Sequence, residues 1–150
     1  MAKTIKTQAL EAIKTALEET VTEAKKVVRF PVAGMDLDTL PVPLLFFFDD
    51  TEDRVRRNRL MTGKMRVMVC CYIPLTTSET IEAQDLADTI QAKIHTAMMV
   101  HAATGNPLIN MVEEETFAKD YPNSEFILLV GVYQVTYQHN FGNGFSQTGY

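Results

Sequence analysis

The chain has no tryptophan, only two cysteines, and no apolar run approaching the length of a membrane span. Because a helix needs about 20 apolar residues to cross a bilayer, no transmembrane segment is predicted. The N-terminal stretch "MAKTIKTQALEAIK" also lacks the apolar core of a signal peptide. Cys70 and Cys71 are neighbours in a predicted strand, where adjacent side chains point to opposite faces, so we expect no disulfide between them. Together these features predict a soluble protein of cytosolic type.

Positive charge is scarce in the C-terminal part of the chain. From Ile94 onward Lys119 is the one base, whereas five acids lie there: Glu113, Glu114, Glu115, Asp120 and Glu125. The net charge of −5 argues against a general nucleic-acid-binding protein, since such domains are usually basic. A length of 150 residues, with 46% hydrophobic and 22% charged residues, is typical of a single globular domain.

Residue patterns that support catalysis or cofactor binding are also missing. His95 and His101 are six positions apart on a predicted helix, about 240° around its axis, so they are not expected to share a metal ion. The "GNG" at 142–144 follows a strand, but no helix can follow it, which excludes a dinucleotide loop. No serine lies in a nucleophile-elbow pattern. We therefore predict no enzyme, and no catalytic, metal or cofactor site.

The periodicity of apolar residues predicts two helices and four to five strands. Apolar residues recur every three or four positions from Ile5 to Ala24, and again from a capping-box pattern at Thr76 to about Ala103. The predicted strands are 26–32, 44–48, 64–73, 109–117 and 125–138. This order predicts an α+β fold, in which two long helices pack against a mixed, mostly antiparallel sheet. We expect one domain over residues 1–138 and a mobile tail over 139–150.

A strongly charged stretch, "DDTEDRVRRNRLMTGKMR", separates two of the apolar strands. Its first five residues include four acids, and six bases follow with no acid among them. We interpret this stretch, residues 49–66, as containing a long charged loop, for which three roles are open. It could bind DNA phosphates, be a solvated hairpin loop, or meet acids of a partner in an assembly.

The overall layout resembles the tail terminator, or tail-completion, proteins of long-tailed bacteriophages. The segments that carry the resemblance are "LPVPLLFFFDD", the charged stretch, "MRVMVCCYIP", the helix "ETIEAQDLADTIQAKIHTAM" and the late strand "LLVGVYQVTYQ". The resemblance covers roughly residues 3 to 138. It implies a structural virion protein, assembled in the host cytoplasm, which forms a ring of usually six copies at the head-proximal end of the tail tube. Such a ring ends tube polymerisation and joins the tail to the head connector.

The resemblance also implies roles for particular residues. A ring needs two unlike faces that fit each other, and we expect the bases of the charged stretch to contact a neighbouring subunit or the tube. The candidate assembly loop comprises Asp49, Asp50, Arg54, Arg56, Arg57 and Arg59. The candidate subunit interface comprises Phe46, Phe48, Met99 and Val100. The candidate channel wall comprises Glu113, Glu114 and Glu115.

Partners follow from the same resemblance: further copies of this chain, the tail tube protein and the head-completion or connector protein. DNA would pass through the ring without specific binding, and no membrane is involved. Two alternatives remain open. One is another head–tail connector or neck protein, and the other is a small-molecule-binding α+β domain.

Overall fold

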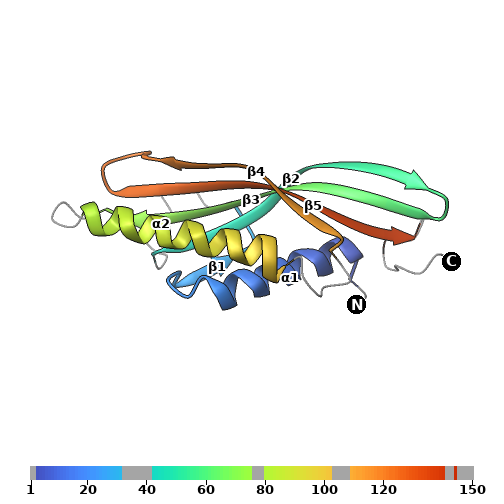
Figure 1. Cartoon of the computed structure of the whole chain (residues 1–150), viewed down its shortest axis with the longest axis horizontal. Helices are drawn as coiled ribbons and strands as arrows, with labels where there is room; N and C mark the ends of the chain where they lie inside the picture. The colour runs from blue at the N-terminus through green and yellow to red at the C-terminus, as the bar shows by residue number, and fades with distance from the viewer. Residues whose placement is uncertain (1–2, 32–41, 76–79, 103–108, 141–143, 145–150) are drawn as a thin grey trace.

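The computed structural model describes residues 3–31, 42–75, 80–102, 109–140 and 144 (Figure 1). These residues form an α+β fold with two helices and a five-stranded sheet. The helices are α1 (Ile5–Thr20) and α2 (Thr80–Thr96), and α2 continues into a π-helical turn (Ala97–His101). The strands are β1 (Lys26–Val28), β2 (Leu44–Arg57), β3 (Leu60–Pro74), β4 (Met111–Asp120) and β5 (Phe126–Asn140).

The sheet is mixed and mostly antiparallel, which confirms that part of the prediction. Its strand order is β1-β2-β3-β5-β4, with β1 parallel to β2 and every other pair antiparallel. Pro43 immediately precedes β2, so its missing N–H falls outside the ladder, as the sequence required. The strands β2, β3 and β5 are much longer than β1 and form the body of the sheet.

The α1 helix is shorter than the sequence predicted. The α1 helix begins at Thr4, whose side-chain oxygen accepts a hydrogen bond from the Thr7 backbone N–H at 3.0 Å. It ends at Thr20 rather than Ala24, where the β-branched residues Thr20, Val21 and Thr22 lower the helix propensity. The predicted capping box of α2 lies outside the described residues.

The end of α2 is not an α-helix. The Ala102 N–H donates to the Ala97 carbonyl at 2.8 Å, an i to i−5 bond that defines a π-helical turn. One turn earlier, the Thr96 hydroxyl donates to the Ala92 carbonyl at 3.1 Å, a contact that often bends helices. The apolar residues at this end of the helix therefore lie on a π-helical turn, which is wider than the α-helical turn that the sequence prediction assumed.

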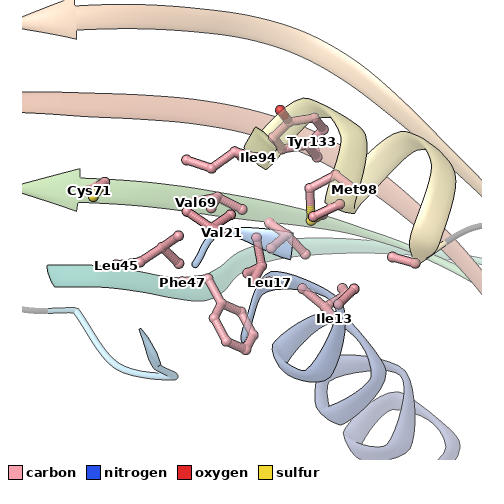
Figure 2. Packing of buried hydrophobic residues seen from close by; sticks show 14 of the residues in the cluster. Ile13, Leu17, Val21, Leu45, Phe47, Val69, Cys71, Ile94, Met98 and Tyr133 are labelled. Carbon is pink, nitrogen blue, oxygen red and sulfur yellow. The ribbon is translucent and has the colours of Figure 1, made fainter. Parts of the chain in front are cut away.

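A large core cluster joins the two helices to one face of the sheet. Both helices lie on the same side of the sheet (Figure 1). Leu17 of α1 and Met98 after α2 belong to the same buried cluster as Phe47 of β2 and Tyr133 of β5 (Figure 2). Alternate residues of each strand enter this cluster, as expected for a pleated strand. We call this the helix side of the sheet.

A second apolar cluster lies on the opposite side of the sheet. It contains the buried residues Leu44, Phe46, Cys70 and Tyr72. Cys71 belongs instead to the helix-side cluster, so the adjacent cysteines point to opposite faces, and both are free thiols. Burial raises the pKa of the Cys70 thiol to about 12 and also raises that of Cys71. Both thiols are therefore protonated, packed side chains.

The predicted charged loop is a regular hairpin, and the loop prediction was wrong. The ladder between β2 and β3 continues to the pair Arg57 and Leu60, so the turn contains only Asn58 and Arg59. Asn58 has a φ of 56°, a conformation that asparagine tolerates and that two-residue hairpin turns require. The sequence did not reveal this strand, because charged residues lie on both of its faces. It therefore lacks the alternation of apolar and polar residues by which a half-buried strand is recognised. We call residues 53–64, the distal part of this hairpin, the arm.

A glycine fixes how the arm packs against β5. Gly63 pairs with Tyr137, and a Cβ atom on Gly63 would lie 2.5 Å from the Tyr137 ring. The tyrosine side chain therefore lies across the glycine, where no larger residue fits without a shift. Tyr137 in turn stacks on His139, with 6.0 Å between ring centroids.

The mobile tail was predicted to begin at residue 139, which is too early. The strand β5 continues to Asn140, and His139 is buried. Gly144 also touches the fold, because its carbonyl accepts a hydrogen bond from the Ile5 N–H at 2.7 Å. The remainder of the predicted tail, 141–143 and 145–150, lies outside the described residues.

Candidate assembly surfaces

Ionic contacts tie the base of the arm to the body of the fold. Lys6 Nζ of α1 lies 2.8 Å from Asp49 Oδ2 and 3.5 Å from Glu52 Oε2, both on β2. Glu52 also accepts hydrogen bonds from Arg54 Nη2 at 3.1 Å and from the Tyr137 hydroxyl. Asp49 is therefore a structural anchor, although the sequence placed it in the assembly loop.

Lys6 controls the ionisation of Asp49. Burial of the Asp49 carboxyl raises its pKa, but the hydrogen bond and the charge of Lys6 act in the opposite direction and prevail. The pKa of Asp49 is consequently below its ordinary value, and the carboxylate is ionised at neutral pH.

Asp50 is also paired within the chain, on the side of the sheet away from the helices. Arg66 of β3 lies between two acids, with Nη1 3.4 Å from Asp50 Oδ2 and Nε 3.6 Å from Glu115 Oε2 of β4. A β-bulge occurs between Asp49 and Glu52, where the ladder shifts by one residue. Neither Asp49 nor Asp50 thus belongs to the arm, and each already has a base within ion-pair distance.

The arm itself is basic and exposed. It contains five bases and one acid. The four arginines predicted for assembly, Arg54, Arg56, Arg57 and Arg59, all lie in it and are all exposed. Arg54 remains 54% exposed in spite of its contact with Glu52. Val55 is 51% exposed, which is unusual for a large apolar residue of a paired strand. The structure therefore brings the predicted arginines together at the tip of one hairpin.

The four residues predicted for the subunit interface do not form one surface. Phe46 and Phe48 point away from the helix side and stack with 6.3 Å between ring centroids. Phe46 is only 5% exposed. Met99 packs against the helix-side core, whereas Val100 is 48% exposed. Of the four, Val100 alone offers a large exposed apolar side chain, and the interface role of this set stays a prediction.

The three glutamates predicted for the channel wall lie on β4, at the edge of the sheet. They are split between its faces. Glu114 faces the helices, where its carboxylate lies 3.2 Å from His95 Nδ1 and accepts a hydrogen bond from the Tyr133 hydroxyl at 3.3 Å. Glu115 is the extra residue of a β-bulge and faces Arg66. Both carboxylates thus have partners within the chain.

Glu114 and Tyr133 affect each other electrostatically. Burial raises the pKa of the Tyr133 hydroxyl, and the adjacent Glu114 carboxylate raises it further. The hydroxyl is therefore a hydrogen-bond donor over the physiological range of pH. It holds Glu114 against the sheet, and Glu113 remains on the opposite face of β4, paired in register with Gln134.

A cleft between α2 and β4 was not predicted from the sequence. It has a volume of about 420 Å³ and is lined by Asp88, Gln91, Ala92, His95, Thr96 and Glu114. The lining residues belong to α2 and β4, which share no sequence motif. The cleft becomes visible only when the pairing of β4 with β5 has placed β4 beside α2. Within the described ranges, no group of three or more His, Cys, Asp or Glu residues is placed to hold a metal ion.

Comparison with known proteins gives no family for this chain. No protein-family model matches it, and no curated protein matches it either. In the part of the chain that the structure describes, no helix is both long and apolar enough to cross a membrane.

Proposed function

We propose that this protein is a structural virion component that forms a ring, of about six copies, at the head-proximal end of a bacteriophage tail tube. The layout of helix, hairpin, helix and late strand, which resembles tail terminator proteins, supports this proposal. In such a ring the two helices pack against one face of the sheet, and the exposed arm is available to neighbours.

The projecting arm is the observation that carries the proposal. Its pairing with β5 extends to Asn140, whereas β4 pairs with β5 only as far as Thr136, so the arm reaches beyond the β4 end of the sheet. The arm contains five bases, and surface charges of like sign repel one another. The arm adds little to the stability of one isolated subunit. In an assembly, by contrast, it offers a positively charged surface for contact with a partner.

The proposed partners are further copies of this chain, the tail tube protein and the connector of the head. DNA would pass through the bore without being held, and the channel-wall role of Glu113, Glu114 and Glu115 belongs to this proposal. Another neck or connector protein would use the same kind of ring at a neighbouring position. The cleft between α2 and β4 favours the remaining alternative, a small-molecule-binding domain.

A tube-length assay tests the proposal. Purified tail tube protein from the same virus is polymerised with and without this chain, and tube lengths are measured in electron micrographs. We expect the chain to cap one end of each tube and to prevent further growth when more tube protein is added. The comparison protein carries Arg54→Glu and Arg57→Glu, so it differs from the wild-type chain in the arm alone. Tubes that grow equally long with and without the wild-type chain would contradict the proposal.

A further inference from the structure

The sheet has two unlike edges. On one side, β1 pairs with β2 only over Leu44–Phe46, so β2 has no strand neighbour on that side from Phe47 to Arg57 among the described residues. On the other side, β4 pairs with β5 and, in the same described part of the chain, with no other strand. Within the described ranges, neither of these stretches of strand edge is paired with a further strand.

The arm and the β4 edge have opposite charge. The arm, which contains the distal end of β2, the turn and the start of β3, has five bases and one acid, and β4 has four acids and one base. The part of β2 before the arm is acidic instead, with Asp49, Asp50 and Glu52. The two edges are separated by β3 and β5, so they are three strand spacings apart, or about 14 Å. That separation exceeds the Debye length of about 8 Å at physiological salt. The surplus bases of the arm and the acids of β4 thus interact only weakly within one chain.

Bulges determine the kind of contact that these edges can make. The ladder shifts between Asp49 and Glu52 on β2 and between Glu114 and Thr116 on β4. Bulges and charges at an edge oppose extension of a sheet by another strand. A contact between these edges would therefore be made by side chains, with charge setting its register and its sensitivity to salt.

We propose that the arm of one subunit lies against the β4 edge of a second copy of this chain, with the exposed bases on the two faces of the arm, Arg54 and Arg57 among them, close to the acids of that edge, which include Glu113 and Glu115. The arm and the β4 edge are different surfaces, so the contact is heterologous and repeats from copy to copy until a ring closes. This inference rests on the proposed function, because it names the contact that would join the subunits of that ring.

Charge reversal tests the contact. One variant carries Arg54→Glu and Arg57→Glu, and a second carries Glu113→Lys and Glu115→Lys. Association is measured by sedimentation velocity at low and at physiological salt. Each variant alone should associate at least about tenfold more weakly than wild type. An equimolar mixture of the two should recover assembly, because every arm then meets an edge of opposite charge. All four changes in one chain should likewise restore self-association.

Two controls separate this contact from other effects. Glu82→Lys with Asp85→Lys reverses two exposed acids on α2 and should leave association unchanged. Thermal unfolding shows that each variant is folded, since Glu115→Lys removes only a partly exposed ion pair with Arg66. Wild-type rings that every reversal leaves intact would overturn this contact and leave the proposed function standing. Loss of assembly in both variants without recovery in the mixture would also overturn it. A wild type that forms no ring, in solution or on tubes, would overturn both.

Discussion

Lys6 on α1 and Asp49 on β2 form an ion pair with 2.8 Å between Nζ and Oδ2, which fastens the first helix to the strand that leads into the arm. Both side chains are 28% exposed, so the pair is partly shielded from solvent. The neighbouring Glu52 extends the contact to Arg54 and Tyr137. The position of the arm relative to the core therefore depends on a small network of charged groups at its base.

This ion pair makes stability dependent on pH. The pKa of Asp49 is lower in the folded state than its ordinary value of 3.8, so its contribution is complete at neutral pH and is lost as the pH falls through the folded pKa. We expect Lys6→Met to lower the free energy of unfolding at neutral pH by roughly 1 kcal/mol or less. The loss of stability between about pH 5 and pH 2 should then be smaller than in wild type.

Urea unfolding at a series of pH values measures this effect. Lys14→Met, a change of the same kind elsewhere on α1, should retain the wild-type dependence on pH. If Lys6→Met and wild type lose the same stability on acidification, Lys6 does not control the ionisation of Asp49.

The facing of α2 can be tested at Ile90. This residue is fully buried in the helix-side core, so Ile90→Asp would bury a charge without a partner and should cost several kcal/mol of stability. Thr89→Asp, the adjacent and exposed position, is the matched control and should change stability by less than about 1 kcal/mol. Thermal or urea unfolding measures both. Equal stability of the two variants would show that the helix faces another way.

Removal of charge from the arm should weaken assembly and leave the stability of the folded chain almost unchanged. Changing the four arginines, Arg54, Arg56, Arg57 and Arg59, to serine should lower the free energy of unfolding by no more than about 1 kcal/mol, since exposed ion pairs contribute little. Capping of tail tubes should nevertheless weaken. The control changes Lys14, Lys25, Lys26 and Arg29 to serine, which removes the same charge from other parts of the fold. Normal capping by the arm variant would show that the arm is only a solvated hairpin.

DNA binding tests the electrostatic role of β4. The wild-type chain should not retard duplex DNA in a gel at about physiological salt, because a bore that DNA traverses must not hold phosphate. With Glu113, Glu114 and Glu115 changed to lysine, DNA should be retarded, more strongly at low salt. Retention of DNA by the wild type that disappears when Arg54 and Arg57 are replaced would make the arm a nucleic-acid-binding element.

The same triple variant distinguishes the two roles of these glutamates. If they line the channel, the ring should remain intact and hold DNA inside it. If they lie between subunits, the ring itself should be lost before DNA binding is measured. Sedimentation of the variant without DNA decides between the two.

The sequence predicted the elements whose side chains alternate between apolar and polar environments. The strand at 64–73 and the helix through Ile90 were correctly placed, because burial on one face imposes a period on the residues. The arm was missed because charged residues on both faces of a hairpin give no such period. The π-helical turn at 97–101 was missed as well, because its i to i−5 bond leaves no sequence signal.

Contacts between distant segments could not be predicted from the sequence, for a different reason. Lys6 and Asp49, or His95 and Glu114, meet only because the strand order places their elements side by side. Nothing in the local sequence of α2 indicates that β4 runs beside it. The split of Glu114 and Glu115 between two faces was predictable from strand geometry, but their partners His95 and Arg66 were not.

The most direct measurement of the central claim is the location of the protein on isolated phage tails. Tails are purified from the virus that encodes this chain, labelled with a gold-conjugated antibody against it, and imaged in the electron microscope. We predict a single label at the head-proximal tip of each tail, on a ring that averaging resolves into about six subunits. Label distributed along the tube, confined to the distal tip, or absent from the tails would contradict the account.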